Sequence, residues 1–193
     1  MERKSKKTVP KSSIAIDYPE HAFEKEELEE IERTLQSINY SLITHSHERK
    51  VMASFEELSA YISIFISSDI IQAICLGLAT NGVYDTLKKT ITLVYNKLRI
   101  KKFARIQSGK IDTNATPNVH IIFGQAHVIL PMTLDDDKFK YFVDKLFNSI
   151  DSEIVTRKCY SRYDENTGEI TYYSEEQVVR KYYSEWLQKQ KNN

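Results

Sequence analysis

The chain has 193 residues, of which 27 are basic and 27 acidic, so its formal net charge is zero, and 41% of its residues are hydrophobic. This composition predicts an ordinary soluble globular protein with one domain, whose core needs no metal or disulfide to hold it together. The balanced charge removes the overall electrostatic case for a binder of nucleic acid or acidic membranes, so any such partner must be argued from a local patch.

The two cysteines, Cys75 and Cys159, lie far apart and fit neither a disulfide framework nor a zinc ribbon, which favours a reducing compartment. The basic N-terminal segment is followed by no apolar stretch of the kind that a secretory signal needs. The longest apolar stretch, residues 70–84, is interrupted by polar residues and too short to cross a membrane. We therefore expect a cytoplasmic protein without a membrane span.

The first 50 residues predict a tail, a strand, a helix and a second strand. Residues 1–12 are basic and almost without apolar side chains, which predicts a flexible tail before a single domain over 13–193. Residues 13–17 alternate in polarity like a short strand. From 20 to 38, apolar residues recur at steps of three and four, as in an amphipathic helix, and a strand is predicted over 40–44.

A helical layer is predicted over residues 54–100. Ser54–Glu57 has the form of a capping box, and Leu58, Tyr61, Ile62 and Phe65 supply one face of the helix that it starts. The triplet at 67–69 offers a break or a new cap before a helical period that continues to Leu98.

Within that long run, Ala73, Gly77 and Asn81 are spaced by four, which on a helix places small side chains in one line. We expect this line to be a helix-packing seam inside the protein rather than a self-association surface.

The clearest local signal is a β-hairpin over residues 119–130, turned by Gly124 and Gln125. Pairing across this turn predicts a core face and an opposite face that carries His120 and His127 as diagonal neighbours. The core face comprises Val119, Ile121, Phe123, Ala126, Val128 and Leu130.

The last third predicts a helix, a second hairpin and a closing helix. The segment 133–136 caps a helix that runs to about residue 150, and the hairpin joins 157–163 to 169–173 through a turn that contains Gly168. The segment 174–177 caps a helix to about residue 190, so that 157–190 forms a C-terminal hairpin plus helix. This order of elements predicts an α+β fold, with a mostly antiparallel sheet and helices on one face.

Known catalytic motifs are absent from the sequence. There is no P-loop, no glycine-rich dinucleotide fingerprint, no HExxH and no GxSxG, and no cysteine lies near a histidine. These absences disfavour P-loop hydrolysis of nucleotides, zinc-protease chemistry and serine hydrolysis at an elbow motif.

Histidines are the remaining candidates for chemistry. His45 and His47 share one face if residues 40–48 are extended, and with His120 and His127 they could converge. Imidazoles bind transition metals and serve as general acid and base near neutral pH. A metal site usually needs a carboxylate or a closed set of ligands, and nothing in the sequence makes these strands neighbours. We therefore favour ordinary surface or hydrogen-bonded histidines, and predict no metal and no cofactor.

The C-terminal third interleaves aromatic and basic side chains, which is typical of protein interfaces and also of stacking platforms for unpaired bases. Acidic residues intermingle there and would repel phosphates, which favours a protein over a nucleic acid, although strand packing alone also recruits tyrosine. The candidate partner-binding residues are Arg157, Tyr160, Arg162, Tyr163, Tyr172, Tyr173, Arg180, Tyr183 and Trp186.

Taken together, the sequence favours a non-enzymatic protein-interaction or regulatory subunit of a bacterial cytoplasmic complex, with a protein partner or a second copy of the chain. The compositional bias suggests a stress, toxin or phage-defence system. Two alternatives stay open. One is a metal-dependent nuclease or phosphoesterase that uses the four histidines, and the other is a single-stranded nucleic-acid binder that uses the C-terminal surface.

Overall fold

The computed structural model describes residues 12–47, 61–107 and 110–180. The strands of this part are β1 (Ser13–Pro19), β2 (Ser41–His47), β3 (Tyr61–Ile66), β4 (Phe103–Gln107), β5 (Lys110–Ala115), β6 (Asn118–Phe123), β7 (Ala126–Ile129), β8 (Cys159–Asp164) and β9 (Glu169–Ser174). The helices are α1 (Lys25–Gln36), α2 (Ser68–Cys75), α3 (Asn81–Arg99), α4 (Asp136–Ser149) and α5 (Ser152–Thr156), and residues 175–180 begin a further helix.

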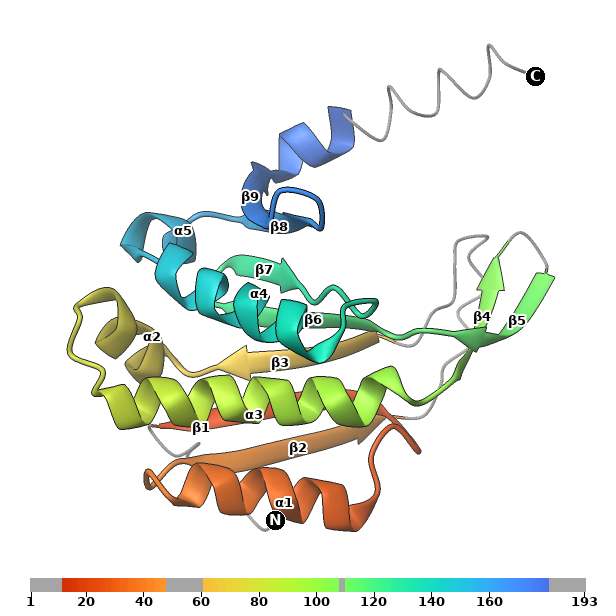
Figure 1. Cartoon of the computed structure of the whole chain (residues 1–193), viewed down its shortest axis with the longest axis horizontal. Coiled ribbons are helices and arrows are strands. Elements are labelled where there is room, and N and C mark those ends of the chain that lie inside the picture. Colours follow the sequence, from red (N-terminus) through yellow and green to blue (C-terminus); the bar gives the residue numbers. More distant parts are fainter. Residues whose placement is uncertain (1–11, 48–60, 108–109, 181–193) are drawn as a thin grey trace, which may run out of the picture.

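Within the described residues, seven strands form one sheet in the order β2-β1-β3-β6-β7-β8-β9, and β4 and β5 form a separate hairpin that projects from it (Figure 1). The pairs β1–β2, β3–β6 and β7–β8 are parallel, and the pairs that alternate with them are antiparallel. The α+β class is confirmed, but the sheet is mixed rather than mostly antiparallel.

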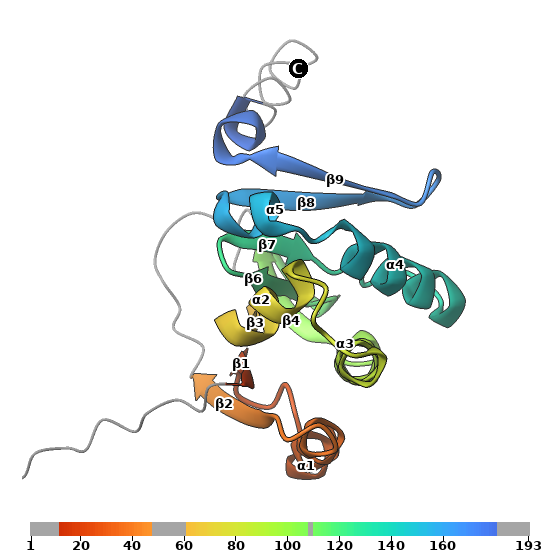
Figure 2. The same cartoon turned by 90° about the vertical axis from the view of Figure 1, so that its left-hand side faces the viewer.

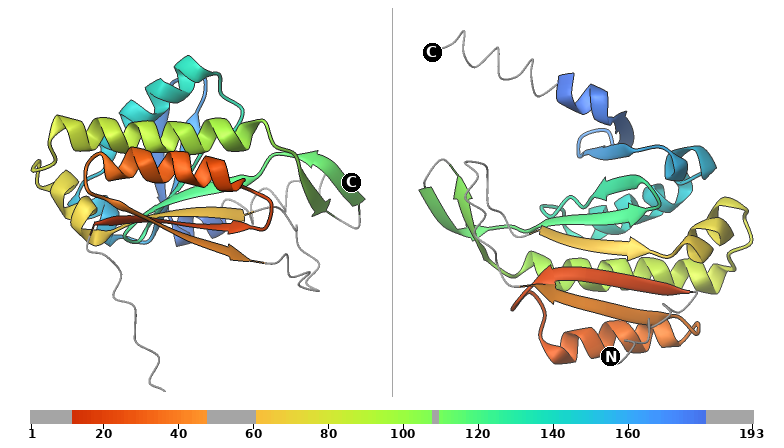
Figure 3. Two further views of the ribbon diagram at one scale, coloured as in Figure 1. Left: turned by 90° about the horizontal axis from the view of Figure 1, so that it is seen from below. Right: turned by 180° about the vertical axis from the view of Figure 1, so that it is seen from behind.

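The helices α1, α3 and α4 form a layer on one face of the sheet, as the edge-on view shows (Figure 2). The core lies between this layer and the sheet, and the largest of its fully buried side chains include Tyr95, Phe123, Phe139 and Phe142. The opposite face of the sheet turns toward the viewer in the right-hand panel of Figure 3, where no helix of the described residues lies over β1, β2, β3 and β6. The candidate site is built on this open face.

The N-terminal elements form as the sequence predicts. In β1, Ile14 and Ile16 are buried and alternate with less buried neighbours, as in a strand with one core face. α1 begins after Glu24, whose capping box with Glu27 satisfies backbone N–H groups of the first turn, and it buries Ile31 and Leu35. The predicted flexible tail over residues 1–12 lies outside the described residues except for its last residue.

The predicted helix through Tyr61, Ile62 and Phe65 is wrong over residues 61–66, which form strand β3 near the middle of the sheet. Ile62, Ile64 and Ile66 are buried, whereas Tyr61 and Phe65 are exposed, which is a period of two. A short apolar run fits both periods, and the β-branched isoleucines favour the strand. The segment 54–60, with its proposed capping box and Leu58, lies outside the described residues.

The predicted long helix to Leu98 is two helices, and the proposed packing seam is therefore wrong. Ala73 lies in α2, Gly77 lies between the helices in a left-handed conformation with φ 66°, and Asn81 is the first residue of α3. Because the chain turns at Gly77, the three small residues do not form one line on a helix. Ser67 is the N-cap of α2, so the predicted break at 67–69 is confirmed.

Both predicted hairpins are confirmed. Gly124 has a φ of 62°, and Gln125 is not among the described residues with positive φ, as a type II′ turn requires. The register pairs Ile121 with Val128 and Phe123 with Ala126. The six residues of the predicted core face are all buried. Gly168 turns the second hairpin with a φ of 69°.

Two elements of the second half were not predicted, namely the β4–β5 hairpin and the five-residue helix α5. The α4 cap is also shifted. Asp135 accepts a hydrogen bond from the Lys138 backbone N–H, so the cap is one residue before the helix rather than at Thr133. The closing helix begins as predicted, because Ser174 and Gln177 form a reciprocal capping box, and its continuation beyond residue 180 lies outside the described residues. Within the described residues, no helix is long and apolar enough to cross a membrane.

Candidate functional site: the open face of the sheet

The strand register aligns the open-face side chains in rows that run across the sheet. Side chains that lie directly opposite each other on paired strands point to the same face, so a row can be followed from pair to pair. One row contains His45, Asp17, Ser63, His120 and Ile129. A second row contains Ile43, Ala15, Phe65, Ile122, His127, Tyr160 and Tyr173 and spans all seven strands.

At one edge of the open face, two imidazoles meet one carboxylate. The parallel pairing of β1 and β2 places Asp17 directly opposite His45, and His47 follows two residues later on the same face. The Nδ1 atoms of His45 and His47 lie 3.1 and 2.9 Å from the same Asp17 oxygen, Oδ1. One ligand-type atom from each of the three side chains lies within 4.8 Å of the other two. The prediction that His45 and His47 share a face is confirmed.

The electrostatics of this cluster favour an ionised carboxylate. Partial burial of Asp17 opposes its ionisation, but the hydrogen bonds from His45 and His47 and their charges outweigh it, so the pKa of Asp17 is lowered. A carboxylate that is ionised and faces two imidazole nitrogens is a set of donors that suits a divalent transition metal.

In the middle of the open face, the second histidine pair lies among aromatic rings. The ring centres of His120 and His127 are 6.4 Å apart, and Tyr61 and Tyr160 flank them at 4.5 and 5.2 Å. Burial, followed by the charge of His127, lowers the pKa of His120 to about 4. The buried Nδ1 atom of His120 has no hydrogen-bond partner among the described residues. The prediction that these two rings approach each other is confirmed.

The four histidines do not meet at one centre. Strands β1 and β3 stand between β2, which carries His45 and His47, and β6, which carries His120. Three strand spacings separate His45 from His120, which is about 14 Å. The fold therefore does not allow a single metal or catalytic centre built from all four imidazoles. The order of strands in a sheet is set by long-range pairing, which the sequence pattern does not reveal.

The predicted partner-binding residues of the last third are divided between the two faces of the sheet. Tyr160 is paired with Tyr173 on the open face, and Arg162 follows Tyr160 by two residues. By contrast, Tyr163 packs against Phe142 of α4, with ring centres 5.1 Å apart.

Tyr172 also belongs to the helix-covered side, where its hydroxyl lies 2.9 Å from the Ser149 hydroxyl and burial raises its pKa to about 12. Arg157 pairs with Glu153 at 3.4 Å and Arg180 with Glu176 at 2.6 Å, both on exposed helical surface. Tyr183 and Trp186 lie outside the described residues.

A groove with a volume of ≈ 710 Å³ crosses the open face between the hairpins and the start of the last helix. Its lining includes His120, Ile129, Tyr160, Arg162, Tyr173 and Gln177. The groove thus contains both the central His120 and the open-face part of the predicted C-terminal surface, and it offers aromatic rings, three apolar side chains and one guanidinium.

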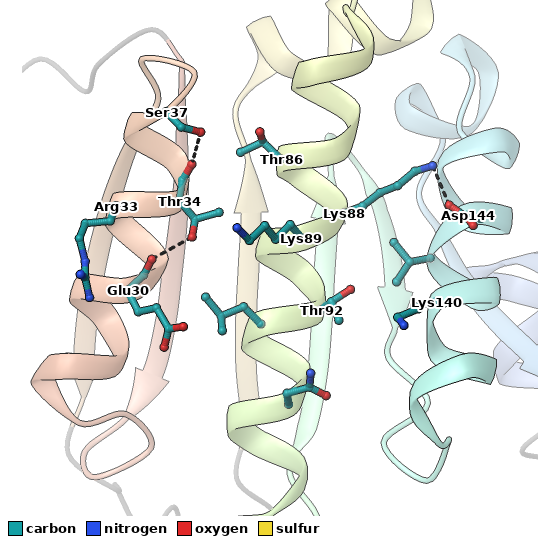
Figure 4. A pocket seen from close by; sticks show the side chains of 13 residues that line it. Glu30, Arg33, Thr34, Ser37, Thr86, Lys88, Lys89, Thr92, Lys140 and Asp144 are labelled. Atoms are coloured by element: carbon teal, nitrogen blue, oxygen red, sulfur yellow. Dashed lines mark hydrogen bonds and ion pairs between the residues drawn. The ribbon is translucent and has the colours of Figure 1, made fainter.

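A second groove, of ≈ 880 Å³, lies on the outside of the helical layer between α1, α3 and α4 (Figure 4). Its lining holds four basic and two acidic side chains, of which Lys88 pairs with Asp144 at 2.6 Å, and Glu30 pairs with the neighbouring Lys97 at 2.7 Å. Because its lining contains no aromatic side chain and no histidine, the open face is the better candidate site.

The open-face residues that the sequence analysis did not identify include Asp17, Tyr61 and Phe65. Asp17 alternates with Ile14 and Ile16 in a strand whose apolar residues point to the core, so it had to lie on the opposite face. This alternation was the signal that could have found it. Tyr61 and Phe65 were assigned to a helix, and this error concealed that both side chains point to the open face of the sheet.

Comparison of the chain with family models, with curated proteins and with solved structures finds no match.

Proposed function

We propose that the chain is a non-enzymatic interaction or regulatory subunit of a bacterial cytoplasmic complex, and that it binds a protein partner through the open face of its sheet. The observation that carries this proposal is the exposure of large apolar side chains in the middle of a seven-stranded sheet. Tyr61, Phe65 and Ile129 are 43%, 40% and 41% exposed, although they stand on interior strands.

Apolar exposure at this place is unusual for physical reasons. A sheet that is covered on one face only normally presents polar side chains to water on the other. Here the row through Phe65, Ile122, His127, Tyr160 and Tyr173 is mainly aromatic and apolar. Contiguous apolar surface that remains exposed marks an interaction site, and aromatic side chains supply most of the binding energy at protein interfaces.

The charges of this face favour a protein over a nucleic acid. Lys158 is neutralised by Glu175 at 2.8 Å, and Asp17 adds a negative charge at the other edge. Arg162 lines the groove and has no acidic partner among the described residues. One arginine is too little to hold a phosphate backbone, for which affinity rests on several Lys or Arg contacts.

We therefore specify the partner by its chemistry. It presents a segment with apolar side chains for the Phe65–Tyr173 row and with an acidic side chain that pairs with Arg162. Arg162 is exposed at the groove, and an arginine forms its strongest contacts with a carboxylate, because two parallel hydrogen bonds can form. The association with a stress, toxin or phage-defence system rests on composition alone.

The test is site-specific photo-crosslinking of the full chain in cells of its own host, with the crosslinking amino acid at position 65 or at position 141. Tyr141 is 48% exposed on α4 and is the matched control, since it is an aromatic residue on the helical layer. We expect one defined protein adduct from position 65 and none from position 141. We also expect the Arg162→Glu variant to lose this adduct.

Other outcomes overturn the proposal. Adducts of equal yield from both positions would show that the partner does not bind preferentially to the open face. An adduct with nucleic acid would identify the competing class, and an adduct with a second copy of the chain would replace the separate partner by a homo-oligomer.

A further inference from the structure

We propose that Asp17, His45 and His47 form a binding site for one divalent transition-metal ion, with Zn²⁺ as the reference ion, at the β1–β2 edge of the open face. This inference goes beyond the proposed partner binding and does not depend on it, because the three side chains belong to neighbouring strands of one chain.

The spacing of the donor atoms fits a bound ion. Ligand atoms that each lie about 2.1 Å from an ion at angles of 90–109° are about 3.0–3.4 Å from one another. The Nδ1 atoms of His45 and His47 lie 3.1 and 2.9 Å from Asp17 Oδ1. One ligand atom of each of the three residues lies within 4.8 Å of the other two, so rotations of the side chains, without any change in the strand register, would bring the donors around an ion.

The backbone holds the three side chains ready for an ion. Asp17 and His45 are directly opposite in a parallel ladder that runs the whole length of β1 and β2. The carbonyl of His47 accepts a hydrogen bond from the Glu20 backbone N–H at 3.0 Å, which anchors the end of β2 beside the cluster. Ligands that are placed on strands rather than on loops lose little freedom when the ion binds.

The donor set selects the class of metal. Two imidazoles and one carboxylate suit Zn²⁺, Co²⁺, Ni²⁺ or Fe²⁺, whereas Mg²⁺ and Ca²⁺ prefer sets made only of oxygen atoms. The side chains of His45, Asp17 and His47 are 73%, 42% and 41% exposed, so an ion can enter from solvent. Three protein ligands leave at least one coordination position for water or for a ligand that another molecule supplies.

The competing interpretation is a plain hydrogen-bonded cluster, in which each imidazole donates its Nδ1 proton to the carboxylate. The two interpretations differ in what they predict for added metal. A metal site binds one ion per chain and releases protons from its ligands as it does so. Its affinity for the ion falls when any one of the three donors is removed. A hydrogen-bonded cluster binds no ion in a stoichiometric manner.

The experiment titrates the untagged full-length chain, stripped with a chelator, with Co²⁺ while its visible absorption is recorded, and then displaces Co²⁺ with Zn²⁺. We expect one Co²⁺ per chain, and at least tenfold weaker binding for each of the variants Asp17→Asn, His45→Ala and His47→Ala. The matched controls are His120→Ala and His127→Ala on the same face, which should keep the affinity within twofold.

Two results overturn the inference. One is the absence of saturable binding below about 0.1 mM metal. The other is stoichiometric binding that survives all three substitutions, since the ion then lies elsewhere. A folding defect is separated from loss of ligands by thermal unfolding, because Zn²⁺ should raise the Tm of the wild type and of the controls but not that of the three variants.

Discussion

Alternate residues of strand β6 serve the core on one face of the sheet and the candidate site on the other. Val119, Ile121 and Phe123 are fully buried beneath the helical layer, whereas His120 and Ile122 point to the open face and are only partly buried. The covered face stabilises the fold through close packing, and the open face carries the rings and donor atoms available for recognition. Stability and candidate function therefore lie on neighbouring residues but can be perturbed separately.

The strongest test of this comparison replaces one phenylalanine on each face. Phe123 has no exposed surface and packs against Phe147 with ring centres 6.1 Å apart, so Phe123→Ala leaves a cavity. We expect the free energy of unfolding to fall by about 3–5 kcal/mol. Phe65→Ala, at a site that is 40% exposed, should cost less than about 1 kcal/mol. Urea denaturation measures both values, and equal losses would contradict the division between the faces.

The next test concerns the turn that keeps the two faces distinct, because a slip of one residue would exchange them. Gly124 has a φ of 62°, and a Cβ atom there would lie 2.5 Å from the Val155 carbonyl oxygen. Gln125 also donates to this carbonyl at 2.9 Å, so the backbone cannot easily move away. We expect Gly124→Ala to destabilise the protein by about 2–4 kcal/mol.

The matched control for the turn is Gly82→Ala. Gly82 lies in the first turn of α3, where the nearest atom to a new Cβ is 4.0 Å away. This substitution should stabilise the protein by up to about 1 kcal/mol, because alanine favours the helix. Thermal unfolding of the two variants gives opposite shifts of Tm if the turn is as constrained as its geometry indicates.

A smaller effect is expected from the pH dependence of His120. Its folded-state pKa of about 4 lies below the unfolded value of 6.5, so the unfolded chain takes up the proton first as the pH falls. This contribution to stability is present above pH 6.5 and is lost between pH 6.5 and 4. After a discount for partial solvent contact, we expect the loss to be about 2 kcal/mol.

The variant His120→Phe keeps a ring beside Tyr61 and removes the titration. As the pH falls from 7 to 4, the wild type should therefore lose more unfolding free energy than this variant does. A difference that does not vary with pH would show that the imidazole is well solvated. His127, whose pKa is lowered first by burial and then by Lys158, should give a change in the same direction.

The elements that the sequence predicts well are those with strong local signals. The hairpin around Gly124 and the face that carries Val119, Ile121 and Phe123 follow from turn chemistry and alternation alone. The prediction for β3 was wrong because its short, mainly apolar sequence fits both the helical and the strand period, and only pairing with β1 and β6 decides between them.

The residues of the candidate site were even harder to predict, because they come together only through pairing between distant strands. The sequence indicates that His45 and His47 share a face, but their carboxylate partner Asp17 lies 28 residues before His45 and reaches it only through a parallel crossover. Likewise, the tyrosines of the second hairpin can be placed on the open or covered face only when the register is known, and Tyr163 and Tyr172 prove to be on the covered side. Local patterns give the direction of a side chain relative to its own strand, and long-range pairing decides what it meets.

The smallest expected effect on stability belongs to Asp17, in the presence of a chelator. Asp17 is only partly buried and its contacts to His45 and His47 are open to solvent, so Asp17→Asn should lower the free energy of unfolding at pH 7 by less than about 1 kcal/mol. Because the folded state lowers the pKa of Asp17 from 3.8, this contribution is present above that value and fades as the pH falls through the folded pKa. Urea denaturation at pH 7 and pH 3 measures it. A loss above about 2 kcal/mol would mean that this carboxylate, although it lies on the open face, stabilises the fold as strongly as a covered residue, and the division between the two faces would then fail at β1.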